Sequence, residues 1–348
     1  MKKYIPLCLL AGFIFCMLGW GYYALAQKER AAKQATYAAA EHLLVYSDLS
    51  DSVNRGMAGA FYQRTGLSVQ IQTMSDRKLQ ETVTDMGGQE KPDLIIAAEQ
   101  VLRNVGSKGL LRTCSVTGAE RVLPSFKDRK NRWLGLWYNP MVFAVSADYY
   151  KQYGHTLQGW QDIVKQTNCR ILFPDLAATD MAGDFLCTLV EMQGRDNTAA
   201  YLRRIQQQRI SYAKTWAINV RRVAGGEVDL AVVDESNAAQ YQAEGAPLVI
   251  VYPREGTSYW LTGIGLTVWN HESEIAASFV EWLLSPDVTR VLQQQQVFVE
   301  YTTTPHPYRS DAAGKRLVLF PVKKEYTDEG RSVLQDWWLR TVRFGRDR

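Results

Sequence analysis

The stretch YPREGTSYWLTGIGL, at residues 252–266, decides how this chain is organised. It leaves a strand, turns through residues 253–256, presents hydroxyl and aromatic side chains, and re-enters an apolar strand at residues 263–266. Polar groups beside a Gly/Pro turn can orient a small ligand in a crevice. A plain surface loop between two strands has the same local composition, so the flanking sequence has to decide between the two interpretations.

The flanking sequence contains two series of alternating strands and helices. Residues 43–111 alternate three short apolar strands with three helices, which indicates parallel β-α units. A long strand-like run, WLGLWYNPMVFAVS at residues 133–146, interrupts this series, and a second α/β series follows it. The stretch 252–266 then returns toward the first series.

This order predicts an α/β protein of two lobes joined by two crossover strands. Two crossings make a hinge, and the crevice between the lobes is the expected ligand site. The expected boundaries place residues 42–138 plus 264–348 in lobe one and residues 139–263 in lobe two.

Size, charge and motifs limit the function classes. The chain has 348 residues, enough for two domains of ordinary size. Its formal net charge is +4, and Lys2 and Lys3 supply two of these charges, so charge gives no argument for a nucleic-acid partner. The four histidines have no metal-ligand spacing, and the sequence holds no Gly-rich phosphate loop or nucleophile elbow. We therefore expect neither a cofactor nor enzymatic activity.

The N-terminus indicates export. Lys2 and Lys3 precede an uncharged run at residues 5–26, which ends in a small-x-small cleavage site. The same run is about long enough to span a bilayer, and aromatic residues near its end suit a membrane interface. Residues 1–26 are thus expected to be a signal peptide or a membrane anchor, and residues 27–41 a helical tether. The rest is expected at the periplasmic or extracellular face of the membrane.

Three cysteines lie beyond the export segment, namely Cys114, Cys169 and Cys187. In an oxidising compartment Cys169 and Cys187 could form a disulfide, because they are close in sequence. Buried free thiols are the alternative, since reduced cysteine behaves as a small apolar residue.

The chain resembles the extracellular solute-binding proteins of bacterial ABC importers, in the ferric-iron/phosphonate-type cluster with the type II periplasmic-binding fold. The resemblance covers residue 42 to the C-terminus. It rests on a series of weak motifs in the right order: VYSDLS (45–50), PDLIIA (92–97), RWLGLWYNPMVFAVS (132–146), WQDIV (160–164), ILFPDLAATD (171–180), VRRVAGGEVDLAVVDE (220–235), PREGTSYWLTGIGL (253–266), FVEWLLSPDVTRVL (279–292) and TTTPHPYRSD (302–311).

The resemblance implies a monomeric receptor that closes about its hinge on a small solute outside the membrane and delivers the solute to a permease. A membrane-retained sensor domain with the same fold is the alternative, and an exported enzyme on this fold is a weaker one. Ferric-binding members use an adjacent tyrosine pair soon after the strand that matches residues 229–233. Here Asp234, Glu235, Ser236 and Asn237 stand at that place, which argues against tyrosinate iron binding.

Polar residues that follow the expected strands are the candidate ligand contacts, because such positions gather at the crevice of open α/β sheets. Several have a local alternative, since Ser, Thr and Asp also cap helix N-termini. Asp234 and Glu235 could serve as oxygen ligands for a metal ion, as partners for an amine, or as a cap for the next helix. Asp180, at the start of the helix after the 170–173 strand, would repel phosphate. The expected contacts are Ser47, Asp48, Glu99, Thr179, Asp234, Glu235 and Thr257.

Overall fold

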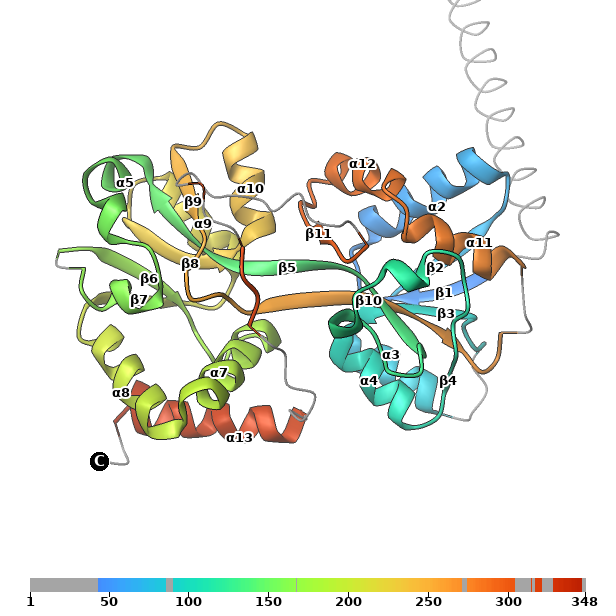
Figure 1. The fold of residues 1–348 in the computed structure, drawn as a ribbon, viewed down its shortest axis with the longest axis horizontal. Coiled ribbons are helices and arrows are strands. Elements are labelled where there is room, and N and C mark those ends of the chain that lie inside the picture. The colour runs from blue at the N-terminus through green and yellow to red at the C-terminus, as the bar shows by residue number, and fades with distance from the viewer. Residues whose placement is uncertain are drawn as a thin grey trace, which may run out of the picture.

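Two α/β lobes linked by two long strands make up the protein in a computed structural model (Figure 1). The structure describes residues 43–85, 90–166, 168–270, 274–303, 314, 317–320 and 328–345. The expected signal peptide or anchor at residues 1–26 and the expected tether at residues 27–41 lie outside the described residues. Within these ranges, no helix combines the length and the hydropathy needed to cross a membrane.

The first lobe is built on three parallel strands, each followed by a helix. The strands lie in the order β2-β1-β3, and β3 pairs antiparallel with β10. Its elements are β1 (Leu43–Ser47), α2 (Asp51–Thr65), β2 (Val69–Thr73), α3 (Asp76–Thr84), β3 (Leu94–Ala98), α4 (Glu99–Ser107), β4 (Leu111–Arg112), α11 (Glu274–Leu283), α12 (Asp287–Gln294) and β11 (Glu300–Tyr301).

The second lobe repeats this design. β8 pairs antiparallel with the second half of β5, and β6 runs parallel to both β8 and β7. Its elements are α5 (Ala147–Tyr153), α6 (Trp160–Ile163), β6 (Arg170–Pro174), α7 (Asp180–Gln193), α8 (Arg195–Gln206), β7 (Arg209–Ala213), α9 (Trp216–Ala224), β8 (Leu230–Asp234), α10 (Glu235–Ala243) and β9 (Leu248–Val251).

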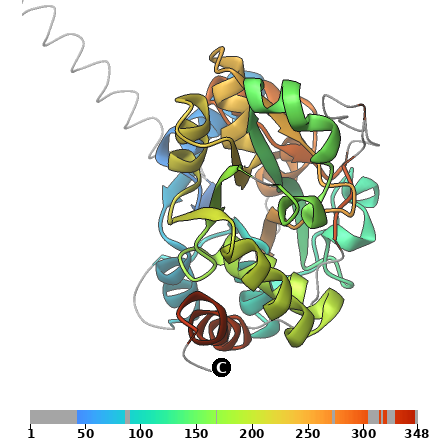
Figure 2. The same cartoon turned by 90° about the vertical axis from the view of Figure 1, so that its left-hand side faces the viewer.

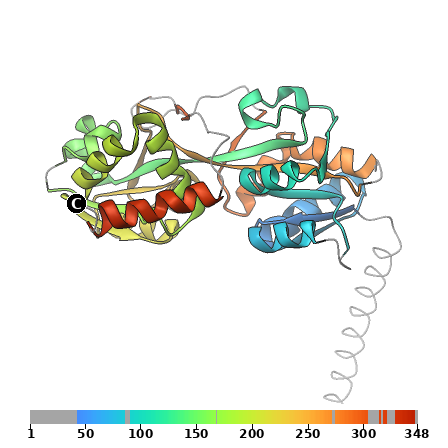
Figure 3. The same ribbon diagram turned by 90° about the horizontal axis from the view of Figure 1, so that it is seen from below.

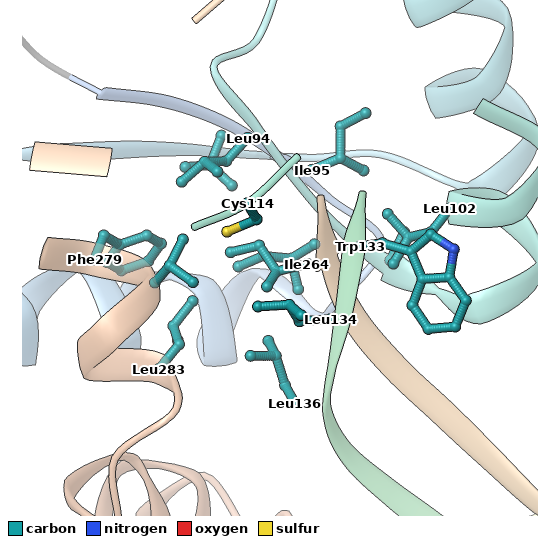
Figure 4. Packing of buried hydrophobic residues seen from close by; sticks show 14 of the residues in the cluster. Leu94, Ile95, Leu102, Cys114, Trp133, Leu134, Leu136, Ile264, Phe279 and Leu283 are labelled. Atoms are coloured by element: carbon teal, nitrogen blue, oxygen red, sulfur yellow. The ribbon is translucent and has the colours of Figure 1, made fainter. Parts of the chain in front are cut away.

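The linking strands are β5 (Trp133–Ser146) and β10 (Tyr259–Thr267), and they pair with each other antiparallel. β5 belongs to the first hydrophobic core up to Tyr138 and to the second from Met141. This change of core, the break in β5, falls at Asn139-Pro140, where proline has no backbone N–H to donate to the strand ladder. Figure 4 shows the first core, in which Trp133, Leu134 and Leu136 of β5 pack with Ile264 of β10 and with side chains from β3, α4 and α11.

The C-terminal segment differs from the expected boundary, which placed residues 264–348 in lobe one. Helix α13 (Asp328–Trp338) lies against α7 of the second lobe, as Figure 3 shows from below. In Figure 2, which faces the second lobe, α13 lies at the lower edge. Trp338 and Phe320 are both buried in the second core. Gly183 of α7 permits this close approach, because a Cβ there would lie 2.8 Å from Cδ of Arg331.

Gly263 of β10 is required by packing. The β5–β10 register shifts between Thr262 and Gly263, and a Cβ at Gly263 would lie 2.7 Å from the Leu134 carbonyl oxygen. We expect Gly263→Ala to lower the free energy of unfolding by about 1–3 kcal/mol, since backbone has to move to admit the methyl group. Gly59→Ala is the matched control, because a Cβ there meets nothing within 4 Å on α2. Urea denaturation measures both, and equal stability of the two variants would contradict the packing argument.

The assignment of α13 to the second lobe is tested by Trp338→Ala. Trp338 is fully buried and makes an edge contact with Tyr212 of β7 at a ring distance of 5.8 Å. Loss of a buried tryptophan costs about 3–5 kcal/mol. Hydrogen exchange should therefore speed up in the second lobe and stay nearly unchanged in β1 and β3. Faster exchange in the first lobe alone would refute the assignment.

Candidate functional site between the lobes

The strand directions place every parallel strand end at the crevice between the lobes. β3 runs antiparallel to β10, so its last residue, Ala98, pairs with Thr262 near the start of β10. β8 runs antiparallel to β5, and its last residue, Asp234, pairs with Met141 just after the break. β1 and β2 run with β3, and β6 and β7 run with β8. The helices that follow these strands therefore begin at the crevice.

Acidic residues occupy most of these helix starts. The first residue is acidic in α2, α3, α4, α7 and α10, whereas α9 begins with Trp216. A helix N-terminus attracts negative charge, and in crevices of this kind it commonly holds a bound anion. At the starts of α2, α3, α4 and α10 the chain places its own carboxyl groups, which makes these helix starts poor sites for a phosphate group.

Ser47 and Asp48 lie at the end of β1 and are tied to the neighbouring strands. The Ser47 hydroxyl accepts from the Leu49 amide at 3.1 Å and is buried. One carboxylate oxygen of Asp48 accepts from the Ala98 amide at 2.7 Å, which brings the Asp48 side chain to the start of α4. Burial, and then the adjacent Asp76 carboxyl group, raise the pKa of Asp48 to about 7.

Among the expected ligand contacts, Glu99 lines a pocket between the lobes. It forms an ion pair with Arg103 one turn along α4. The pocket encloses about 50 Å³, and its walls come from α4, α7, the start of β10 and Phe320. Asp184 of α7 lies on the opposite wall and forms an ion pair with Arg331 of α13 at 3.0 Å. A second cavity of about 580 Å³ shares Gln100 and Trp260 with this pocket and is also lined by Arg331.

Ser258, which directly precedes β10, and Trp260 within β10 both line the pocket. Ser258 is buried, and its hydroxyl oxygen has no hydrogen-bond partner in the part of the chain that the structure describes. Trp260 is partly buried and packs against the cores of both lobes. The stretch at residues 252–266 therefore does reach the crevice, through Ser258 and Trp260 rather than through Thr257.

Thr257 and Thr179 are occupied by structural hydrogen bonds. The Thr257 hydroxyl donates to the Met141 carbonyl oxygen at 2.7 Å, and its side chain is fully buried. Thr179 caps α7 by accepting from the Ala182 amide at 3.2 Å. Ligand contact by Thr179 stays a prediction, and the structure gives Thr257 a role in holding the hinge.

Asp234 and Glu235 point into the second lobe. Asp234 caps α10, accepting from the Asn237 amide at 3.1 Å and from the Asn139 side-chain amide at 2.9 Å. Glu235 accepts from the Tyr252 hydroxyl at 2.5 Å. Both side chains are at most 2% exposed. Among the alternatives that the sequence left open, the structure shows the helix cap for Asp234. The hydrogen bond from Asn139 to Asp234 ties α10 to the break in β5.

Cys114, Cys169 and Cys187 are buried free thiols, so the alternative of a Cys169–Cys187 disulfide is not realised. Cys187 lines the interlobe pocket. Burial raises the pKa of its thiol to about 12, so Cys187 contributes an uncharged thiol to the pocket wall. In the described ranges, no group of three or more His, Cys, Asp and Glu side chains is close enough to hold a metal ion.

The expected ligand contacts did not include the pocket residues Arg103, Asp184, Ser258 and Trp260. Arg103 was within reach, because it lies four residues after Glu99 on an expected helix. Ser258 and Trp260 stand in the stretch that the sequence singled out, but their burial was not visible. Asp184 had no local signal, since its partner Arg331 is 147 residues away.

The pKa of Asp48 makes stability depend on pH. Its folded-state value of about 7 lies above the ordinary 3.8, so the native state binds more protons between these values. Stability should therefore fall as pH rises from about 4 to about 7. Asp48→Asn removes this term, and we expect it to be more stable than the wild type at pH 8 by on the order of 1–3 kcal/mol.

Denaturation at several pH values checks this expectation. Asp76→Asn serves as a partner control, because loss of the neighbouring carboxylate should reduce the same slope. Parallel pH profiles for the wild type and Asp48→Asn would show that Asp48 titrates normally in the folded state.

Comparison with known proteins supports the fold and defines the family. Solved structures with the same fold include the periplasmic binding protein AfuA from Actinobacillus pleuropneumoniae with fructose 6-phosphate bound, at 20% identity and a TM-score of 0.66 over 87% of this chain and 99% of that one. Iron-bound HitA from Pseudomonas aeruginosa matches at 18% identity and a TM-score of 0.69, over 85% and 98% of the two chains.

A curated relative, an uncharacterized protein from Haemophilus influenzae, is 26% identical over 194 residues. The match covers 54% of this chain, and the chain spans about half of that relative's length, 56%. The profile of bacterial extracellular solute-binding proteins matches residues 56–304. Its match runs through both lobes and both linking strands, so this chain belongs to the bacterial extracellular solute-binding protein family and has its two-lobed α/β fold.

Proposed function

We propose that the protein is the extracytoplasmic receptor of an ABC importer, which captures a small solute between its lobes and delivers it to a membrane permease. The observation that carries this proposal is the pocket whose walls come from α4 of the first lobe and α7 of the second. A solute bound there contacts both lobes only when they are close together. Binding therefore favours the closed arrangement by the difference in affinity between the two states.

The arrangement of the hinge supports this motion. On the side of α10 and α12 the lobes are already in contact, because the Ser236 hydroxyl accepts from the Phe298 amide at 3.0 Å and Gln240 bonds Gln296 at 3.1 Å. Figure 1 shows α4 and α7 on the other side of the linking strands. Closure about these strands would therefore narrow the α4–α7 side, where the pocket lies.

The solutes of the structural neighbours are not carried over to this chain. Iron is bound in HitA and fructose 6-phosphate in AfuA, but identities of 18% and 20% support the shared fold only. Asp234, Glu235, Ser236 and Asn237 stand where ferric-binding proteins are expected to have a tyrosine pair. Glu235 is buried against Tyr252. The carboxyl groups at the helix starts in turn disfavour a phosphate ester. The solute of this receptor has to be found from its own pocket.

A solute screen on the purified protein tests the receptor function. A solute present at 100 times its dissociation constant should add about 2.7 kcal/mol to stability. Small-angle scattering should show a smaller radius of gyration with that solute bound. Uptake of the labelled solute by cells should require the gene, which separates an importer receptor from a sensor.

Two variants test whether the solute binds in the crevice. Glu99→Gln and Asp184→Asn change opposite walls of the pocket, and each should weaken binding about tenfold or more, as loss of a charged hydrogen-bond partner does. Arg222→Gln is the control, because Arg222 pairs with Glu227 outside the pocket. A protein that neither gains stability nor changes shape with any solute in the screen would not be a receptor of this kind.

A further inference from the structure

The interlobe pocket is lined by charged groups of both signs. The first lobe contributes the Glu99–Arg103 pair on α4, and the second contributes Asp184, paired with Arg331. The side chains of Glu99 and Arg103 are only 11% and 21% exposed, so both charges lie largely out of water. The first wall thus offers a carboxylate and a guanidinium group to a solute, and the second offers the Asp184 carboxylate, whose partner Arg331 lines the adjoining cavity.

A lining with charges of both signs selects against ions of a single sign. A simple cation would gain from Glu99 and Asp184 but would be repelled by Arg103, and the reverse holds for a simple anion. A guanidinium group has five N–H donors, so Arg103 keeps donors for a ligand while it pairs with Glu99. A carboxylate can likewise accept from more than one donor. A solute with one positive and one negative end can therefore use both kinds of group without breaking either pair.

The Ser258 hydroxyl provides a separate sign of a ligand. A buried hydroxyl without a partner is costly, and native proteins satisfy nearly all such groups. Ser258 is 5% exposed and lines the pocket, and its oxygen has no hydrogen-bond partner among the described residues. A polar solute atom in the pocket would satisfy it.

The two cavities limit the shape of the solute. The pocket itself, about 50 Å³, suits a compact polar group. The adjoining cavity of about 580 Å³ meets it at Gln100 and Trp260 and is lined mainly by polar side chains of α3 and α4. A solute with a small charged head and a polar remainder fits this pair of spaces.

From these observations we propose that the solute is a small zwitterion of the amino-acid type, whose carboxylate pairs with Arg103 and whose ammonium group pairs with Asp184, with Ser258 as a further hydrogen-bond partner. This proposal rests on the receptor function proposed above and specifies its solute class. Because the two charged ends contact opposite lobes, one solute molecule would bridge the crevice and hold it closed.

A matched set of ligands tests the charge requirement on the wild-type protein. Calorimetry would compare a panel of free amino acids with their N-acetyl derivatives, which lack the positive end, and their amides, which lack the negative end. We expect at least one free amino acid to bind, and blocking either end to weaken it about 30-fold or more. Equal binding of the blocked forms would overturn the proposal.

Variants assign the two ends to the two walls. Arg103→Gln should weaken the free amino acid at least tenfold and shift the preference toward the amide. Asp184→Asn should shift the preference toward the N-acetyl form. Ser258→Ala should weaken binding of the free amino acid about threefold to tenfold. Arg222→Gln should bind like the wild type. Arg103→Lys, which keeps the charge, would recover part of the affinity if Arg103 binds the carboxylate, and circular dichroism would show that each variant is folded.

The outcomes separate this proposal from the receptor function. If a phosphate ester, a metal ion or a neutral sugar stabilises the protein and closes the lobes while amino acids do not bind, the zwitterion proposal is wrong and the receptor function stands. If no solute of any class closes the lobes, both proposals fail.

Discussion

The antiparallel pairing of β5 with β10 is the constraint on which the rest of the structure depends. β5 and β10 pair with each other and join the sheets of the two lobes. Their direction fixes the direction of the strands that pair with them, β3 in the first lobe and β8 in the second. Because β3 and β8 are each antiparallel to a linking strand, the carboxyl ends of both parallel sets must face each other. The crevice is thus a result of strand direction, before any side chain is considered.

The side chains at these strand ends divide into two groups. Asp234, Glu235 and Thr257 are turned inward and hold the hinge region together, through Asn139, Tyr252 and Met141 respectively. Glu99, Arg103, Asp184 and Ser258 face the space between the lobes. A hinge needs the side chains of the first group to stay in place, because the lobes then move about strand ends that keep their positions. A binding site needs the second group to retain unused hydrogen-bonding capacity.

The C-terminal helix supports the second group. The chain returns from β11 in the first lobe to α13 on the second, where Arg331 supplies the partner of Asp184. Gly183 lets α13 approach α7 closely enough for this pair to form. The charge on the second wall of the pocket therefore depends on a packing contact made far along the chain, and not on α7 alone.

The sequence by itself determined the two-lobed α/β fold and the family, because strand and helix periodicity and the strand-loop-helix motifs are local patterns. It also identified Glu99, which follows an apolar strand, and the stretch around Ser258 and Trp260. Only the tertiary structure decided that Asp234 caps a helix while Asp184 lines the pocket, and that α13 joins the second lobe. The local sequence around an acidic residue does not tell whether its side chain points inward or outward. The choice is made by partners such as Asn139 and Arg331, which are 95 and 147 residues away.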